Sequence, residues 1–249
     1  AAVPPALLGD VQADIGGAKY DGFSFVDGDA VGYGFNVGVL YEPTKSTRFG
    51  LHYRSKVDIE LEGDVDFTVG ALDAFLGSVF PDGGGIVDLE LPSMLNISVH
   101  HQINDALAVM ADAQHTSWSS FETLEIQFTN PTPPNSVVPE NWEDIWRFSA
   151  GLSYQVNDGL KLRAGIAHDQ SPVPGDRFRS PRIPDADRLW FSAGFEYAFS
   201  EAVKVNAGAT YITVDDPVIR NDTHSAGQFL RGTIDASVTI FSLSTVVDF

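Results

Sequence analysis

The fold is decided by residues 141–199, NWEDIWRFSAGLSYQVNDGLKLRAGIAHDQSPVPGDRFRSPRIPDADRLWFSAGFEYAF. Over residues 146–156 every second side chain is apolar, and those between are mostly polar or small. Successive side chains of a β-strand point to opposite faces, so this alternation predicts a strand with one apolar and one polar face. Residues 157–159, Asn-Asp-Gly, predict a tight turn into a second such strand at residues 160–167. A long proline-containing loop then leads to a third strand at residues 187–199.

The same pattern recurs along the rest of the chain. Alternation predicts nine antiparallel strands, at residues 29–41, 47–62, 93–102, 106–128, 146–156, 160–167, 187–199 and 203–214, with a last strand that ends at Phe249. Short connections near residues 44, 104, 158 and 200 alternate with long ones near residues 77, 135, 178 and 223. Residues 1–28 have little periodicity, and we expect them to form the end of a loop. The sequence therefore predicts an all-β fold and a single domain.

Composition limits the classes of function. A net charge of -19 disfavours nucleic-acid binding, which depends on Lys and Arg neutralising phosphates. The absence of cysteine excludes disulfides, thiolate metal sites and cysteine nucleophiles. No apolar run approaches the roughly 18 residues that a membrane-spanning helix needs. A membrane-spanning β-strand needs only about 9–11 alternating residues, so the question of a membrane rests on the strands.

Three features favour a transmembrane β-barrel over a soluble β-sandwich, which also alternates. Residues 47–62 alternate for longer than the roughly 5–6 residues of most soluble strands. Short and long connections alternate, as periplasmic turns and extracellular loops do in outer-membrane barrels. Aromatic residues lie near strand ends on the apolar face, as in an interfacial girdle: Tyr41, Tyr53, Trp146, Tyr154, Tyr197, Phe199 and Tyr211. We therefore predict an antiparallel transmembrane β-barrel in the outer membrane of a Gram-negative bacterium.

Several motifs, in order along the chain, resemble one family. They are RFGLHYRSKV (48–57), TSWSSFETL (116–124), LRAGIAHDQSPVP (162–174), RIPDADRLWFSAGFEYAF (182–199) and the terminal Phe249. They resemble outer-membrane transporters of the FadL/TodX type, which import long-chain fatty acids and other hydrophobic compounds. The resemblance runs from about residue 19 to the C-terminus.

The resemblance implies a fourteen-stranded barrel whose N-terminal segment folds inside it as a hatch. The nine strands predicted here would leave two long sheet edges exposed, which a membrane forbids. We therefore expect residues 1–249 to be the C-terminal portion of a longer protein. They would form a single barrel domain from which the hatch and the first strands are absent.

Basic residues gather on the polar faces of the predicted strands, hence in the lumen. They are Arg48, Arg54, Lys56, Arg147, Lys161, Arg163, Arg188 and Lys204. We select Arg54, Lys56, Arg147, Arg163 and Arg188 as candidates that attract an anionic head group through charge-assisted hydrogen bonds. Alternatively, the cations pair across strands with Asp58, Glu60, Glu62, Asp112, Glu196 and Asp235 and fill the lumen as structure. The resemblance implies another ligand contact from a basic residue just before Asp144, and that position is Glu143 here.

Residues 64–90 contain the one segment with helical spacing, formed by Val69, Leu72, Phe75, Leu76 and Val79 and ended by Pro81. The resemblance implies an outer hydrophobic groove that captures apolar substrate. We assign to it Leu72, Phe75, Leu76, Val79 and Phe80. The alternative is that these side chains pack against neighbouring loops.

Acidic and basic residues occur together in and around the proline-rich loop that follows residue 167. Asp169, Asp176, Asp185 and Asp187 lie among Arg177, Arg179, Arg182 and Arg188. This arrangement predicts ion pairs that fix the loop. A Ca²⁺ site or a lipopolysaccharide-bridging site is the alternative.

No enzyme motif of the GxSxG, HExxH or P-loop kind occurs in the sequence. His100 and His101 are adjacent, so on a strand they face opposite sides and cannot chelate one metal. We expect no catalysis, metal or cofactor. The expected function is passive uptake of long-chain fatty acids or other hydrophobic compounds. A general polar-solute porin and a soluble or surface β-sandwich adhesin are the alternatives.

The expected partners follow from this function. They are a hydrophobic small molecule such as a fatty acid or hydrocarbon, or a detergent in its place, together with membrane lipid and lipopolysaccharide. The resemblance also implies recognition of the C-terminal Phe249 by the outer-membrane assembly machinery. No nucleic acid is expected.

Overall fold

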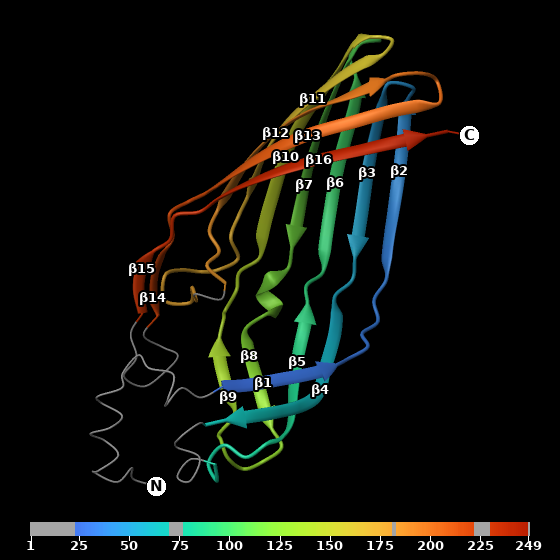
Figure 1. Cartoon of the computed structure of the whole chain (residues 1–249). Coiled ribbons are helices and arrows are strands. Elements are labelled where there is room, and N and C mark those ends of the chain that lie inside the picture. Colours follow the sequence, from blue (N-terminus) through green and yellow to red (C-terminus); the bar gives the residue numbers. More distant parts are fainter. Residues whose placement is uncertain (1–22, 70–76, 181–182, 222–229, 249) are drawn as a thin grey trace. The chain divides into compact units, whose positions relative to one another are not determined.

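A computed structural model describes residues 23–69, 77–180, 183–221 and 230–248 of the chain (Figure 1). The chain divides into two units. Unit 1 comprises residues 1–33, 58–90 and 123–139, and unit 2 comprises residues 34–57, 91–122 and 140–249. Among the described residues, no helix is long and apolar enough to cross a membrane.

Unit 2 is built on a nine-stranded antiparallel sheet. Its strands are β2 (Asn36–Thr44), β3 (Thr47–Arg54), β6 (Met94–Gln102), β7 (Leu107–Thr116), β10 (Ile145–Asn157), β11 (Leu160–Asp169), β12 (Arg188–Ala198), β13 (Val203–Val214) and β16 (Ser237–Val247). In the described part of the chain, they pair in this order from one edge to the other. Short turns join β2 to β3, β6 to β7, β10 to β11 and β12 to β13 at one end, the top of Figure 1. The prediction of an all-β antiparallel fold is therefore confirmed, and this sheet has nine strands, although the described residues form seven further strands outside it.

The two faces of this sheet follow from the alternation of side chains. The register places Ile166 of β11 opposite Phe191 of β12, and Phe191 opposite Tyr211 of β13. These three side chains are 48%, 46% and 47% exposed. An apolar row this open is expected where a sheet faces lipid, and we call this side the outer face. The opposite side, which carries Ala167 and Trp190, is the inner face.

The strand predicted at residues 47–62 is wrong as a single strand. It divides at Ser55 and Lys56 into β3 and β4 (Val57–Thr68), which belong to different sheets. The backbone N–H of Phe35 donates to Ser55 Oγ at 2.9 Å, and the N–H of Ser55 donates to the carbonyl of Phe35 at 2.9 Å. Ser55 Oγ also donates to the carbonyl of Lys56 at 2.9 Å. The buried hydroxyl thus takes the place of ladder hydrogen bonds, and the strand ends there.

The strand predicted at residues 106–128 also divides, into β7, the 3₁₀ helix η2 (Trp118–Ser120) and β8 (Thr123–Phe128). The rings of Trp118 and Phe121 each meet Trp142 edge to face, with ring centroids 4.9 Å apart. The indole N–H of Trp142 donates to the buried carboxylate of Glu140 at 3.2 Å. The bend at η2 brings both rings to one partner, and edge-to-face packing of this kind favours the bend over a continued strand.

Unit 1 holds a five-stranded sheet in the order β1-β4-β5-β8-β9. Three of its strands were not predicted: β1 (Phe23–Asp29), β5 (Gly83–Leu91) and β9 (Ser136–Pro139). The loop predicted up to residue 28 is therefore wrong where β1 begins, and the predicted first strand starts at Asn36 rather than Asp29. In unit 2, the long connection predicted near residue 223 contains the hairpin of β14 (Val218–Asn221) and β15 (Leu230–Thr233). These strands are short or rich in glycine and acid, so alternation does not reveal them.

The predicted helix falls largely on residues 70–76, which lie outside the described residues. Residues 77–80 form a turn. Within unit 1, the ring of Phe80 packs against Phe67 with centroids 5.6 Å apart, and Phe67 packs against Phe128 at 5.7 Å.

Candidate functional site

The inner face of the nine-stranded sheet contains a pocket of about 560 Å³, which we call the inner pocket. Strands β2, β3, β6, β7, β10, β11 and β12 contribute to its wall. The polar side chains that line it are Arg48, Ser98, His100, Asp112, Arg147, Ser149, Trp190 and Ser192. Strand register explains this grouping, since Ser149 lies opposite both Asp112 and Ala167, and Ala167 lies opposite Trp190.

The one carboxylate among the described lining residues is Asp112, and both of its oxygens are engaged. Asn96 Nδ2 donates to Asp112 Oδ2 at 2.9 Å. Ser149 Oγ donates to Asp112 Oδ1. These hydrogen bonds join β6, β7 and β10 across the floor of the pocket.

The guanidinium of Arg147 lies over the ring of Trp190, with Cζ 5.2 Å from the ring centroid. Arg147 is on β10 and Trp190 is on β12, so the two side chains meet above β11. Ala167 of β11 lies opposite Trp190, and its small side chain leaves room for this contact. A cation over an indole face is an attractive arrangement, and it holds both groups at the wall of the pocket.

Of the five predicted ligand cations, only Arg147 lines the inner pocket. Arg163 lines a second inner-face pocket of about 360 Å³, where it pairs with Glu196 and donates to Asn206 Oδ1 at 3.1 Å. Arg54 ends β3 and is exposed. Lys56 lies in the link between β3 and β4. The structure therefore does not bring the five cations together.

Arg188 joins the ends of β11 and β12 to the proline-rich loop. It pairs with Asp169 at 3.1 Å and with Asp185 at 3.2 Å. The prediction that ion pairs fix this loop is confirmed at this residue. The loop also has a pair that the sequence did not reveal, between Asp176 and Arg220 at 3.2 Å.

Other predicted partners in the loop bond differently. Arg179 donates to the carbonyls of Asp185 and Val218 at 2.7 and 2.8 Å. Asp187 accepts the N–H of Ser171 at 2.8 Å and lies 3.7 Å from His168 Nε2. Arg182 lies outside the described residues.

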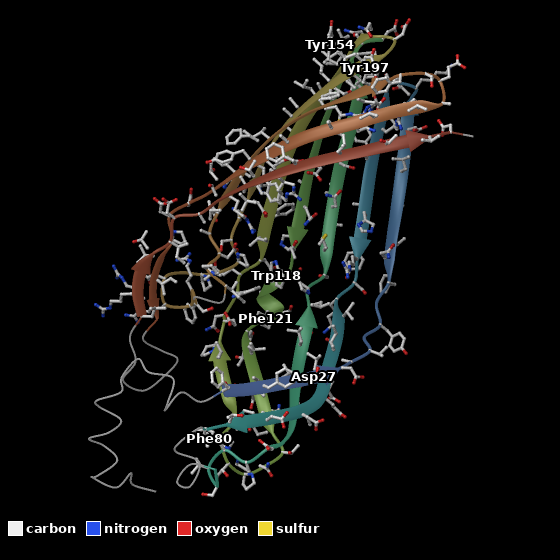
Figure 2. The ribbon with its side chains drawn as sticks, in the orientation of Figure 1. Asp27, Phe80, Trp118, Phe121, Tyr154 and Tyr197 are labelled. Atoms are coloured by element: carbon white, nitrogen blue, oxygen red, sulfur yellow. The ribbon has the colours of Figure 1, made fainter. Side chains whose placement is uncertain are left out.

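The residues assigned to an outer groove are only partly described. Leu72, Phe75 and Leu76 lie outside the described residues. Val79 and Phe80 are half-buried in the turn at residues 77–80 of unit 1, and Figure 2 labels Phe80 there.

Aromatic side chains lie toward both ends of unit 2. Figure 2 labels Tyr154 and Tyr197 near the short turns, and Trp118 and Phe121 near η2. Tyr197 packs edge to face on Phe199 with centroids 4.8 Å apart. Tyrosine and tryptophan at both strand ends are typical of the two membrane interfaces of a barrel.

Glu143 and Asp144 lie in the segment just before β10, on the side of the long loops. The N–H of Glu143 donates to the carbonyl of Pro172 at 2.8 Å. Asp144 Oδ1 accepts the N–H of Ser119 at 2.9 Å, and its Oδ2 lies 3.7 Å from His115 Nε2. Hydrogen bonds from Ser119 and the nearby His115 lower the pKa of Asp144. Both residues hold loops in place, and the exposed Glu143 carboxylate stands where the family resemblance implies a basic residue.

Sequence reasoning missed His100 and Trp190 as members of a site. Both lie on the inner face because they alternate in step with cations that the sequence places on the polar faces of the strands. Trp190 is two residues from Arg188, and His100 lies opposite Arg48. This alternation was the one signal in the sequence that could have identified them, because neither residue is part of a motif. Their grouping with Arg147 depends on the register of five adjacent strands, from β6 to β12.

An antiparallel sheet with an open apolar face, a polar inner face and aromatic ends defines the class of outer-membrane β-barrel proteins. Within that class, the chain belongs to the family described as outer membrane protein transport protein (OMPP1/FadL/TodX), whose model matches residues 7–249.

Two comparisons support this assignment. The long-chain fatty acid transport protein of Escherichia coli O6:H1 is 38% identical over 193 residues, which cover 74% of this chain and 43% of that protein. A crystal structure of a Pseudomonas aeruginosa FadL homologue matches with a TM-score of 0.77 and 29% identity, and covers 87% of this chain and 52% of that one. The chain thus spans about half the length, or less, of these relatives.

A third comparison concerns the fold alone. The crystal structure of the Pseudomonas putida toluene transporter TodX matches with a TM-score of 0.56 and 23% identity, covering 87% of this chain and 49% of that one. The predicted family, fold class and outer-membrane location are confirmed by these matches.

Proposed function

We propose that this chain forms part of the wall of an outer-membrane channel for passive uptake of long-chain fatty acids or other hydrophobic compounds. The observation that carries the proposal is the inner pocket, a polar-rimmed cavity of about 560 Å³ on the inner face of a lipid-facing sheet. Ligand pockets commonly have volumes of about 300–1,000 Å³ and place a few polar groups to orient the ligand. The names of the relatives, a long-chain fatty acid transport protein and a toluene transporter, agree with such a ligand.

The path begins at an apolar surface outside the membrane and continues into the lumen. Leu72, Phe75, Leu76, Val79 and Phe80 would capture substrate from outside. Arg54, Lys56, Arg147, Arg163 and Arg188 would attract an anionic head group inside. Partition from the apolar outer groove into the lumen site and then onward would drive uptake without a cofactor and without a chemical step.

The partners would follow from the two faces and the C-terminus. Membrane lipid would cover the open apolar row of Ile166, Phe191 and Tyr211, with lipopolysaccharide around the long loops. Phe249 would be the residue that the outer-membrane assembly machinery recognises. Residues 1–249 would belong to one barrel domain that also includes a hatch and further strands.

The test separates a transporter from a general porin. The intact protein would be inserted into planar bilayers for conductance and, in detergent, titrated with oleate and with toluene. We expect saturable binding of at least one of these ligands and little ion conductance. Steady conductance of small ions without binding of either ligand would contradict the proposal in favour of a polar-solute porin.

A further inference from the structure

We propose that the β14–β15 hairpin binds phosphate groups of lipopolysaccharide through Arg220 and Arg231, which lie directly opposite each other on its exposed face. The inference rests on the proposed function for the orientation of the barrel, with the long loops outside the cell. The two arginines lie outside the inner pocket and take no part in the proposed uptake path.

Arg220 of β14 and Arg231 of β15 form a cross-strand pair. Directly opposite side chains of an antiparallel pair have Cβ atoms about 4.5–5.5 Å apart, so like charges there repel each other. The chain has 34 acidic residues and 15 basic ones, so a carboxylate would more often stand opposite an arginine by chance. Two guanidinium groups side by side therefore indicate an anion that binds to both.

Both guanidinium groups have hydrogen-bonding capacity to spare. Arg231 is exposed, and among the described residues it has no ion-pair or hydrogen-bond partner. The side chain of Arg220 is 63% exposed, and its Nε lies 3.2 Å from Asp176 Oδ2. A guanidinium held at Nε keeps its two Nη groups, which form a fork that can bind a phosphate bidentately.

The charge of this face is positive although the protein is acidic. Two arginines and the one carboxylate that pairs with them among the described residues, Asp176, leave a charge of about +1 at neutral pH. The whole chain has a net charge of -19. An anion is therefore attracted to the hairpin at short range, where a carboxylate-rich surface would repel it.

The hairpin is anchored, so its arginines are positioned before a ligand binds. The backbone N–H of Arg220 donates to the carbonyl of Asp176 at 2.8 Å. Arg179 Nη1 donates to the carbonyl of Val218 at 2.8 Å. Ile219 is 4% exposed and faces the opposite way from Arg220, so it fixes the buried side of the hairpin. Such preorganisation reduces the entropy that binding costs.

A phosphate fits two opposed arginines better than a carboxylate does. One guanidinium fork can satisfy both oxygens of a carboxylate, whereas a phosphate monoester has three acceptor oxygens and can accept from two forks. The same face carries Val218 and Thr233, which lie opposite each other beside the arginine pair and are exposed. A hydroxyl and an apolar side chain next to two cations match a phosphorylated glycolipid better than a free phosphate ion.

The hairpin extends directly from the end of the wall that lies opposite the short turns (Figure 1). Val218 is four residues beyond Val214, where β13 ends, and Thr233 is four residues before Ser237, where β16 begins. Four residues span at most about 14 Å, so the hairpin lies close to the outer limit of the spanning strands. In the proposed orientation this is the head-group layer of the outer leaflet, where lipopolysaccharide carries phosphates on its innermost sugars.

The experiment compares lipid A with and without its phosphates. The intact protein in dodecyl maltoside would be titrated with diphosphoryl lipid A, or with dephosphorylated lipid A that has the same acyl chains. EDTA would exclude bridging by divalent cations, and microscale thermophoresis would give each Kd. For the wild type we expect diphosphoryl lipid A to bind about tenfold or more tightly than the dephosphorylated form.

Three variants test the two arginines. Arg231→Gln removes one fork and no ion pair, so diphosphoryl lipid A should bind about three- to tenfold more weakly. Arg231→Lys keeps the charge but not the fork, and the loss should be about two- to threefold. Arg220→Gln combined with Arg231→Gln should weaken diphosphoryl lipid A about tenfold or more, and no variant should change the affinity for dephosphorylated lipid A by more than about twofold.

The matched control is Lys45→Gln, which removes one positive charge from the exposed turn between β2 and β3, at the opposite end of the sheet. It should leave both lipid A affinities unchanged. Heat-modifiable migration on gels would verify that each barrel is folded. If the double variant does not fold, the exposed Arg231 alone decides the inference through its two single variants.

Equal affinity of the wild type for the two forms of lipid A would overturn the inference, and so would an unchanged affinity in Arg231→Gln and the double variant. Displacement of diphosphoryl lipid A by millimolar inorganic phosphate would also overturn it, because the hairpin would then bind the free ion. Oleate and toluene should bind every variant as they bind the wild type. A wild type that prefers diphosphoryl lipid A but binds neither oleate nor toluene would contradict the proposed function and leave this inference standing.

Discussion

Ala209 and Thr210 are neighbours on β13 with opposite surroundings. Ala209 lies opposite Phe241 and Ala193 on the outer face, and Thr210 lies opposite Ser192 on the inner face. Arginine at either position adds the same charge. We expect Ala209→Arg to destabilise the barrel strongly and Thr210→Arg to do so weakly, because only the first places a guanidinium in lipid.

The magnitude follows from the position along the strand. Ala209 is near the middle of β13, which spans Val203–Val214 and has 12 residues. It is roughly 20 Å along the strand from Val203 at about 3.3 Å per residue. With a tilt of about 40°, this is roughly 15 Å across a hydrocarbon core about 25–30 Å thick. Ala209 is therefore near the midplane, where arginine costs about 2–4 kcal/mol.

Thr210→Arg should cost about 1 kcal/mol, since it loses the 2.9 Å hydrogen bond to Ser192 but keeps the charge on a polar wall. The expected difference is about 1–3 kcal/mol, or roughly 5- to 150-fold in the folding equilibrium. Guanidinium titration of the intact protein in phosphatidylcholine vesicles, followed by tryptophan fluorescence, would measure it. Ala209→Leu is the control for side-chain volume and should be neutral. Equal destabilisation by the two arginines, or a larger effect at Thr210, would refute the assignment of the faces.

Two further predictions concern the loops. Arg188→Met should lower the free energy of unfolding by about 2–3 kcal/mol, because Asp169 and Asp185 would be left partly buried and unpaired. This loss should largely disappear when both aspartates are also changed to asparagine. An unchanged denaturation midpoint in the single variant would show that the ion pairs contribute nothing. Hydrogen bonds from Ser119 make the pKa of Asp144 lower in the folded state than in the unfolded state. The ionised carboxylate therefore stabilises the folded state above pH about 4, near the unfolded pKa. This stabilisation is lost as the pH falls through the pKa of the folded state. The wild type should therefore lose up to about 1 kcal/mol more than Asp144→Asn between pH 5 and 3, a small effect because Asp144 is largely exposed, and parallel pH curves would contradict it.

The sequence predicts the nine-stranded sheet because the alternation of side chains is a local property that pairing preserves. Ile166, Phe191 and Tyr211 share the outer face as their parity requires. The division at Ser55 could not be predicted, because a single serine is the one interruption of the apolar series from Phe49 to Leu61, and one polar residue does not end a strand. What ends the strand is a hydrogen bond from Phe35, 20 residues earlier.

The candidate site was predictable only in part, for a similar reason. Parity placed Arg147 and Arg163 on one face, but their partners depend on register between strands. Arg163 meets Glu196 of β12, whereas Arg147 meets an aromatic ring on that strand. The pair of Asp176 and Arg220 joins two loops that no sequence pattern connects.

Within the nine-stranded sheet, each strand pairs with the strands that come before and after it among these nine, although the chain forms other strands between β3 and β6, between β7 and β10, and between β13 and β16. Such a meander consists of hairpins laid side by side. Duplication of one hairpin in a gene would widen the wall by two strands and leave every existing pair of neighbours elsewhere in place. Loss of one hairpin would narrow it equally simply. The girth of a pore built this way is open to evolutionary change in steps of two strands, while the inner-face residues of each remaining hairpin keep their positions.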